Sequence, residues 1–139
     1  MKILEILTEK RKIGNIGEAL AAKHLKKHGY KIRKMNYVAN NSEIDIIAEN
    51  KSTLVFIEVK TRNFDKISNF EPRPASAVTP EKQRAIISAA NCYIGLNEIK
   101  GKRIRLDVIE VYLYGDKSKN KIIHIENAFN LNTAYKKGF

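Results

Sequence analysis

Apolar residues recur along the chain with two different spacings, and these spacings predict its secondary structure. Between Asn15 and Gly29 the apolar positions follow a helical period, which predicts a first helix that begins near Asn15 and stops at Gly29. Residues 79–81 (Thr-Pro-Glu) form a typical helix start, so a second helix is expected from there to Gly95. Runs rich in β-branched residues predict strands at 31–38, 42–49, 53–61, 103–114 and 121–127.

The order of these elements is helix, three strands, helix, two strands. This order predicts an α/β fold with a central mixed β-sheet flanked by α-helices. The length of 139 residues favours a single domain over residues 1–139, with residues 1–12 as a possible flexible basic arm. All three prolines lie within nine residues, 72–80, and mark a long loop from 62 to 78.

The composition excludes several classes of protein. Apolar residues make up 43% of the chain and charged residues 29%, which argues against wholesale disorder. No apolar run approaches the ~18 residues that a membrane span needs, and the charged N-terminal segment is a poor signal peptide, so we expect a cytoplasmic protein with no membrane partner. The single cysteine, Cys92, excludes an internal disulfide framework and a cysteine-based zinc cluster.

The charge balance indicates what kind of partner the protein has. The formal net charge is +11, and residues 1–40 alone hold ten basic and three acidic residues. An imbalance of this size in a folded domain suggests a polyanionic partner, most often nucleic acid. A solubilising lysine-rich surface is the alternative.

The hairpin of strands 42–49 and 53–61 carries the candidate chemistry. Strand alternation places Glu43, Asp45 and Ile47 on one face of the first strand, and Ile44, Ile46 and Ala48 on the other. A connecting turn with an even number of residues brings Asp45 to the same face as Glu58 and Lys60. Two adjacent carboxylates repel each other unless a cation lies between them, and Mg²⁺ or Mn²⁺ is the natural choice. Together with a lysine in a basic protein, this set indicates phosphodiester hydrolysis.

The same residues resemble a known pattern. Asp45, twelve intervening residues and then Glu58-Val59-Lys60 resemble the D…(D/E)xK core of the restriction-endonuclease-like nuclease superfamily. More closely, the chain resembles the YraN family of small proteins with that fold, which are similar to archaeal Holliday junction resolvases. The matching segments are GNIGEA at 14–19 with Ala22, GY at 29–30, NY at 36–37, EID at 43–45, FIEVKTR at 56–62, Lys82 with Arg84, and RLDV at 105–108. Ser42 stands where these proteins usually have glycine, but serine fits a strand start and the site is expected to persist.

This resemblance implies a restriction-endonuclease-like fold and a metal-dependent DNA endonuclease, for which structure-selectivity on branched DNA such as junctions is one option. Asp45 and Glu58 would bind Mg²⁺ or Mn²⁺ with the backbone carbonyl of Val59, and Lys60 would be the catalytic lysine. Glu18 matches a first-helix glutamate that often completes the metal site as a further catalytic carboxylate. If junctions are the substrate, a symmetric homodimer is expected, because two related strands must be cut.

Simpler roles are open for each of these residues. Glu18 lies three residues after Asn15, which is the spacing of a capping box at a helix start. Glu43 is either a surface charge or a participant at the site. Glu58 and Lys60 could form an exposed ion pair at a strand end, which would contribute little to stability.

Four basic residues are candidate phosphate contacts: Arg62, Arg73, Lys82 and Arg84. Arg62 follows the site strand, Arg73 lies on the long loop, and the other two lie in the first turns of the second helix, where a solvated face is the alternative. The main alternative to a nuclease is a non-catalytic nucleic-acid-binding module that retains the fold, for which loss of Asp45 or Lys60 would leave salt-sensitive binding unchanged. A protein that binds an acidic protein partner is the third hypothesis, and it predicts no salt-sensitive affinity for DNA.

Overall fold

The computed structural model describes residues 3–63, 78–114 and 120–130 of the chain. Its elements follow the predicted order: α1 (Ile3–Lys27), β1 (Lys31–Ala39), β2 (Ser42–Glu49), β3 (Thr53–Asn63), α2 (Pro80–Leu96), β4 (Arg103–Leu113) and β5 (Lys121–Phe129). The predicted α/β class is confirmed, and the architecture is consistent with a restriction-endonuclease-like fold.

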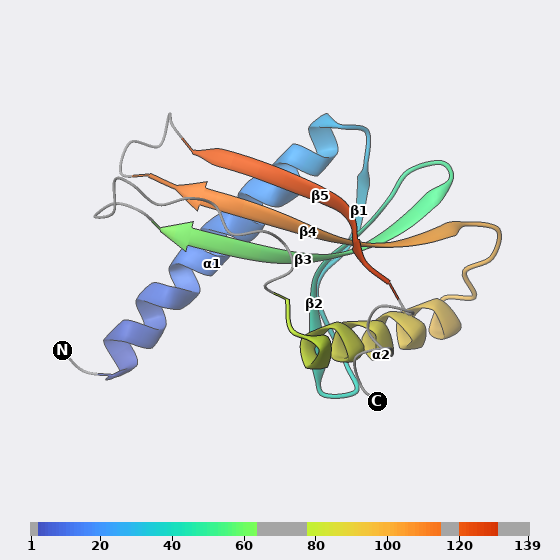
Figure 1. Ribbon diagram of the computed structural model, residues 1–139, viewed down its shortest axis with the longest axis horizontal. Helices are drawn as coiled ribbons and strands as arrows, with labels where there is room; N and C mark the ends of the chain where they lie inside the picture. The colour runs from blue at the N-terminus through green and yellow to red at the C-terminus, as the bar shows by residue number, and fades with distance from the viewer. Residues whose placement is uncertain (1–2, 64–77, 115–119, 131–139) are drawn as a thin grey trace.

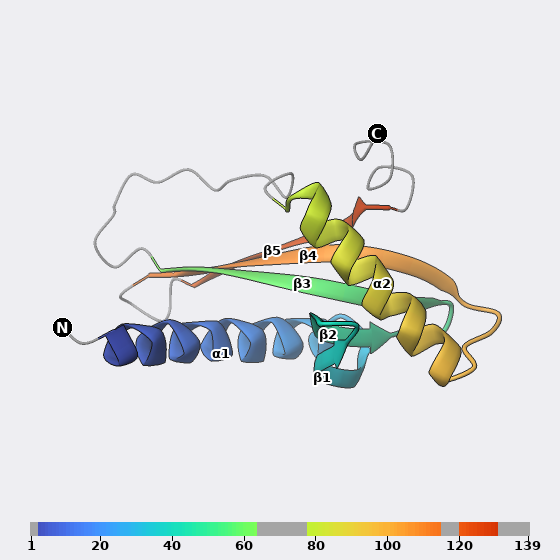
Figure 2. The ribbon, with the colours of Figure 1, turned by 90° about the horizontal axis from the view of Figure 1, so that it is seen from below.

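The five strands form one mixed sheet in the order β1-β2-β3-β4-β5 (Figure 1). Neighbouring strands are antiparallel except for β3 and β4, which are parallel. A parallel pair needs a long crossover connection, and α2 lies within the one that joins these two strands. Figure 2 shows the result as three layers, with α1 on one face of the sheet and α2 on the other.

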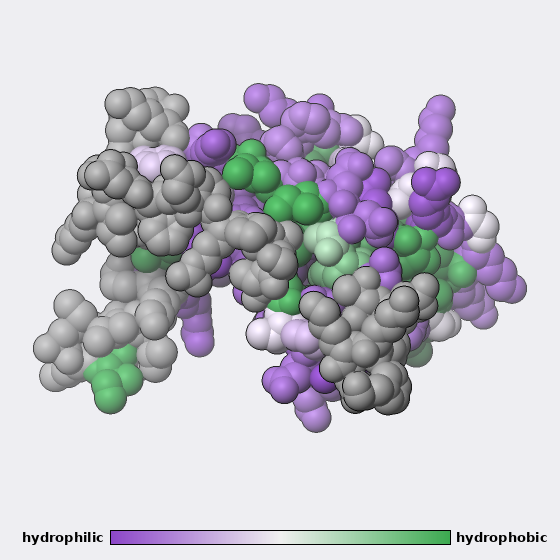
Figure 3. Space-filling model, viewed as in Figure 1, coloured by the Kyte–Doolittle hydropathy of each residue, from purple (hydrophilic) through white to green (hydrophobic). Residues whose placement is uncertain are grey.

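Each face of the sheet has its own hydrophobic core. Leu25 of α1 packs with Ile46, Val55 and Ile57, whereas residues of α2 pack with Phe56 and others on the opposite face. The central strand β3 is therefore buried on both sides, which explains why its sequence is apolar without interruption from Leu54 to Ile57. In the view of Figure 3, the hydrophobic patches on the surface are separated by hydrophilic residues. No helix in the described residues is long and apolar enough to cross a membrane.

Three sequence-based expectations about boundaries and faces are corrected. Helix α1 begins at Ile3 rather than near Asn15, so the basic cluster at residues 10–12 lies within the helix. Strand β3 extends through Asn63 into the predicted loop, and the rest of that loop, residues 64–77, lies outside the described residues. Ile44 packs on the α2 side rather than with Ile46 on the α1 side, so the alternation of β2 is broken at Asp45.

Candidate active site

Asp45 lies where β2 and β3 separate. Their antiparallel pairing runs from Glu49 opposite Leu54 to Ile46 opposite Ile57. Beyond this pair the Asp45 side chain takes the place of the backbone partner, because its Oδ2 accepts a hydrogen bond of 2.8 Å from the backbone N–H of Val59. This bond fixes the carboxylate against β3, next to Glu58.

Glu58 is close enough to affect the protonation of Asp45. Burial, and then the neighbouring negative charge of Glu58, raise the pKa of Asp45 to about 8, although the hydrogen bond from Val59 works in the opposite direction. In the protein alone, burial and the charge of Glu58 therefore favour the protonated form of Asp45. A cation between the two groups would favour the charged form of both.

Glu58 is buried but only partly satisfied. Its side chain is 6% exposed, and its Oε1 faces two ammonium groups, Lys82 Nζ at 3.5 Å and Lys60 Nζ at 3.9 Å. Its Oε2 is buried and has no hydrogen-bond partner among the described residues. Because buried polar atoms in native proteins nearly always have a partner, this oxygen is open to a further group, such as a bound cation, beyond the described residues.

A second acidic pair lies beside the first and is joined by Asn36. The Asn36 side chain donates from Nδ2 to Glu18 Oε1 at 2.7 Å and to Glu43 Oε1 at 2.8 Å. Burial raises the pKa of Glu18, and the charges of Glu43 and Glu58 add to this effect, while the bond from Asn36 partly offsets it. The backbone of Asn36 is left-handed, with φ of 51°, a conformation that asparagine tolerates better than most residues.

Two hollows border these carboxylates. One of about 340 Å³ is lined by Glu18, Val59 and Thr61 together with the α1 segment that includes Gly14. The other, of about 170 Å³, lies between Glu43 and Lys82. Glu18 therefore borders a hollow on the α1 side, and Glu43 borders one on the α2 side.

The donor set fits a hard divalent cation. Two adjacent carboxylates with an unpartnered buried oxygen are the chemistry that Mg²⁺ uses when it binds through one or two carboxylates and retains several waters. Over the described residues, no three His, Cys, Asp or Glu side chains are arranged around one point as a metal-binding group. The pair Asp45 and Glu58 is therefore the part of the site that fits a metal directly, and Glu18 is held to one side by Asn36.

Comparison with known proteins identifies the family. The family described as "Uncharacterised protein family UPF0102" matches residues 17–111, a range that includes Glu18, Asp45, Glu58 and Lys60. The chain belongs to the UPF0102 family. The resemblance to YraN-like proteins that the sequence suggested is thereby confirmed.

Relatives of this UPF0102 chain are similar over nearly their whole length. A UPF0102 protein of Caldanaerobacter subterraneus is 43% identical over 121 residues, which cover 86% of this chain and 96% of the relative. A UPF0102 protein of Alkaliphilus oremlandii is 44% identical, with 86% and 98% covered. One from Flavobacterium johnsoniae is 35% identical over 126 residues, with 88% and 98% covered.

The UPF0102 structure brings together most of the residues that the sequence selected. Asp45, Glu58 and Lys60 meet at the separation of β2 and β3, and Lys82 joins them from the first turn of α2. Glu18 lies next to this group, and its proposed role as a helix cap is wrong, because α1 has already run from Ile3 when it reaches this residue.

The other predicted phosphate contacts are three arginines, and their positions relative to the carboxylates differ. Arg62 lies two residues beyond Lys60 on β3, and its Nε is buried with no hydrogen-bond partner in the described part of the chain. Arg84 is half-buried in α2, one residue beyond the buried Gln83. Arg73 lies outside the described residues.

Sequence reasoning missed two residues of the site. In the sequence Asn36 stands out only as part of the matching Asn-Tyr segment, and nothing local shows that its amide reaches two glutamates in other elements. Gly17 was noted only within the matching GNIGEA segment, although it lies against Thr61 of β3. A glycine inside a helical pattern, such as Gly17, is a usable signal, since glycine there normally destabilises and can indicate a close approach.

Proposed function

We propose that this UPF0102 protein is a nuclease that hydrolyses phosphodiester bonds of DNA with Mg²⁺ or Mn²⁺. The observation that carries the proposal is the buried Glu58 carboxylate with Asp45 at its side: one of its oxygens faces two lysines, and the other has no hydrogen-bond partner among the described residues. A site that only bound nucleic acid would gain nothing from acidic groups at the point where phosphate must approach.

Each residue of the site has a distinct part in this proposal. Asp45 and Glu58 would hold the metal, with the backbone carbonyl of Val59 as an additional ligand, and Glu18 would add negative charge nearby. The bound metal would lower the pKa of a water molecule and polarise the scissile phosphate. The hydrogen bond from the Val59 N–H fixes the direction in which Asp45 presents its oxygens.

The two lysines supply positive charge where the reaction develops negative charge. Lys60 and Lys82 both lie within 4 Å of the same Glu58 oxygen, one from β3 and one from α2. Lys60 would position or deprotonate the attacking water, and Lys82 would contact a phosphate oxygen. The net charge of +11 supplies sequence-independent affinity for a polyanion.

The preferred substrate is proposed to be branched DNA. This selectivity rests on the similarity of the family to junction resolvases. Because two related strands of a junction must be cut, the proposed active form is a symmetric homodimer.

The proposal is tested by comparing wild type with Asp45→Asn, Lys60→Ala and Lys121→Gln, each with Mg²⁺ or Mn²⁺. Linear duplex, single-stranded, flap and four-way-junction DNA are offered in parallel. Asn at position 45 keeps an acceptor for the Val59 N–H, so the variant removes the ionisable carboxyl group without removing the hydrogen bond. Lys121 is exposed at the start of β5 and serves as the control for a general loss of positive charge.

Cleavage that requires metal, persists in Lys121→Gln and is lost in the other two variants would support the nuclease. The absence of cleavage on every DNA, together with salt-sensitive binding that Asp45→Asn retains, would contradict it and would instead favour a non-catalytic binding module.

A further inference from the structure

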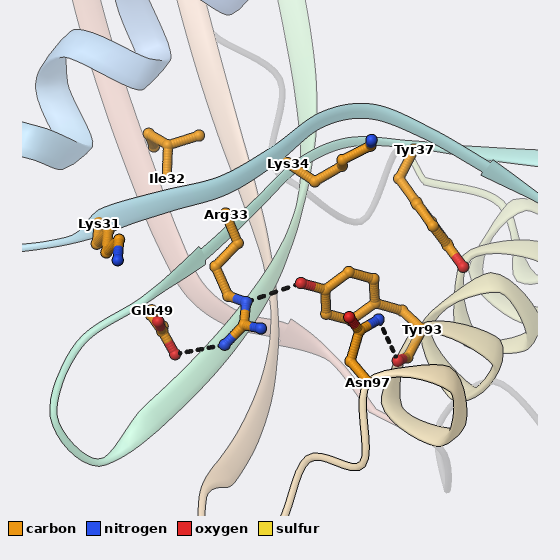
Figure 4. A pocket seen from close by; sticks show the side chains of 8 residues that line it. All are labelled: Lys31, Ile32, Arg33, Lys34, Tyr37, Glu49, Tyr93 and Asn97. Carbon is orange, nitrogen blue, oxygen red and sulfur yellow. Dashed lines mark hydrogen bonds and ion pairs between the residues drawn. The ribbon is translucent and has the colours of Figure 1, made fainter.

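A hollow of about 550 Å³ lies at the opposite end of α2 from the carboxylate site (Figure 4). It opens between β1 and the last turns of α2, with Tyr93 and Asn97 on the helix side. A rise of about 1.5 Å per residue puts Tyr93 roughly 16 Å along the helix axis from Lys82, which contacts Glu58. The two sites therefore lie at the two ends of one helix.

A β-bulge in β1 places an extra basic side chain at this hollow. Ile32 pairs with Ala48 and Lys34 pairs with the preceding residue Ile47, so β1 advances two residues where β2 advances one. Strict alternation would turn Lys34 to the α1 side together with Ile32. Because of the bulge, Lys34 lies opposite Ile47, which packs on the α2 side, and Lys31, Arg33 and Lys34 all line the hollow. Bulges commonly redirect a side chain in this way at functional sites.

Among the described residues that line the hollow, Glu49 alone is acidic, and its charge is already neutralised. Arg33 lies between Glu49 and Tyr93, donating from Nη1 to Glu49 Oε2 at 3.0 Å and from Nε to the Tyr93 hydroxyl at 2.7 Å (Figure 4). Lys102 forms a second ion pair with the same Glu49 oxygen. These cations hold the pKa of Glu49 below its usual value, with the Lys102 contact as the largest cause.

The remaining positive charge is available to a ligand. Lys31 and Lys34 are exposed, and neither has an ion-pair partner within the described residues. With Arg33 and Lys102 balanced against one carboxylate, the hollow and its rim carry a clear excess of positive charge.

We infer that the hollow lined by Lys31, Arg33 and Lys34 binds backbone phosphates of a nucleic-acid strand, as a contact surface separate from the carboxylate site. The inference rests on the proposed function only in taking nucleic acid as the partner. A nucleic acid that contacts both ends of α2 would be held in place on this second surface while the carboxylate site acts on it.

The geometry favours a strand over a small free anion. The two lysines lie on exposed positions of β1, but the hollow is also lined by Glu49 and by residues at the carbonyl end of α2, which carries partial negative charge. A single small anion that entered the hollow would meet both of these groups. Phosphates spaced along a strand can contact the lysines from outside.

The test is a binding measurement that does not depend on cleavage. Affinity for a short fluorescent DNA duplex is measured by anisotropy in EDTA over a series of salt concentrations. The proteins compared are wild type, Lys31→Gln/Lys34→Gln and the control Lys23→Gln/Lys121→Gln. The control also removes two exposed lysines, from α1 and β5, but neither of them lines a hollow described above. All four lysines are exposed, and thermal unfolding checks that each variant is folded.

The hollow variant is expected to bind roughly tenfold more weakly, and the slope of log K against log salt should fall in magnitude by about 1.8, or about 0.9 for each lost phosphate contact. The control should change much less. Equal effects of the two double variants would overturn the inference and leave the carboxylate site unaffected.

Two further outcomes would also overturn the inference. Displacement of the duplex by inorganic phosphate or a mononucleotide at micromolar concentration, lost in Lys31→Gln/Lys34→Gln, would assign the hollow to a small anion. A wild-type protein with no measurable affinity for nucleic acid would overturn this inference and the proposed function together, whereas binding without cleavage on any substrate would overturn the proposed nuclease alone.

Discussion

Gly17 of α1 lies directly against Thr61 of β3, where the long helix crosses the strand that carries Glu58 and Lys60. A Cβ on Gly17 would overlap Thr61 Oγ1 and would lie 2.8 Å from both carbons of that side chain's branch. Since Glu18 is the next residue, the absence of a side chain at Gly17 sets how closely this glutamate approaches the carboxylate site.

We expect Gly17→Ala to destabilise the protein by about 1–3 kcal/mol, because the added methyl group must push α1 away from β3. Gly14→Ala is the matched control, since an added Cβ there meets no atom within 4 Å. Gly14→Ala should stabilise the helix by roughly 0.5–1 kcal/mol through its better helix propensity. Urea unfolding of both variants checks the prediction, and two variants of equal stability would show that Gly17 is not a close contact.

A second prediction concerns the stability of the metal-free protein at different pH values. The pKa of Asp45 is raised to about 8 by burial and by Glu58, so the folded protein keeps a proton that the unfolded chain releases near pH 4. The stability that depends on this proton is fully present below about pH 4 and is lost as the pH rises towards 8, at a slope of up to about 1.4 kcal/mol per pH unit.

Asp45→Asn removes this dependence while keeping an acceptor for the Val59 N–H. In EDTA, the variant should therefore be more stable than wild type at about pH 8, and the difference should shrink as the pH falls towards 5. Denaturant unfolding at several pH values measures this. Parallel stability curves for the two proteins would mean that Asp45 is not the buried, charge-repelled group that the structure describes.

The sequence was sufficient to predict the centre of the site because that part depends on local periodicity. The two-residue period of β3 puts Glu58 and Lys60 on one face, and the structure has their charged groups 3.9 Å apart. The cap at Thr79 was also predictable, because its hydroxyl needs to reach only the Lys82 N–H of the same helix. Lys82 itself was expected to contact phosphate, and its ion pair with Glu58 depends on how α2 packs over the sheet.

Features that depend on contacts with a neighbouring helix or strand could not be predicted from the sequence. Asn15 and Glu18 have the spacing of a helix start, yet α1 continues through both. The glycine at position 17 is explained by its close contact with Thr61, which leaves no room for a side chain. The bulge in β1 and the broken alternation at Asp45 each depend on the pairing with the adjacent strand and on the packing against the adjacent helix. A pattern read along one strand carries no information about these contacts.

A third prediction concerns the buried carboxylate of Asp107, which joins β4 to β5. It accepts hydrogen bonds from Arg105 Nε at 2.9 Å, from the Asn127 N–H at 2.8 Å and from His124 Nε2 at 2.6 Å. Burial alone would raise the pKa of Asp107, but the bonds from His124 and Arg105 together hold it below its usual value. The corresponding stability is present above about pH 4 and is lost as the pH falls below it.

Asp107→Asn should cost roughly 3–5 kcal/mol at neutral pH, because it leaves the Arg105 guanidinium without its buried partner. Glu126→Gln is the control, since Glu126 is an exposed second partner of Arg105 at 3.7 Å and its loss should cost at most about 0.5 kcal/mol. Thermal unfolding at neutral and acidic pH compares them. The prediction fails if the two variants lose similar stability at neutral pH.

The fourth prediction distinguishes the role of Lys82 from that of a general phosphate contact. Its ammonium lies 3.5 Å from Glu58 Oε1, so a divalent cation that binds Glu58 has to compete with it. Lys82→Gln should therefore raise the affinity for Mn²⁺ roughly two- to fivefold, up to about 1 kcal/mol for a half-exposed ion pair, and should lower the affinity for DNA. The helix cap is preserved, because Thr79 accepts its hydrogen bond from the backbone of residue 82.

Isothermal titration with Mn²⁺ measures the first effect and anisotropy with labelled DNA the second. Lys121→Gln, which removes an equal charge from β5, should leave Mn²⁺ binding unchanged, and Asp45→Asn should weaken it severely. Opposite changes in metal and DNA affinity are expected only if Lys82 and the metal share Glu58. If Lys82→Gln lowers both affinities, the lysine instead helps to hold the site together, and the competition derived from the Glu58 contact is wrong.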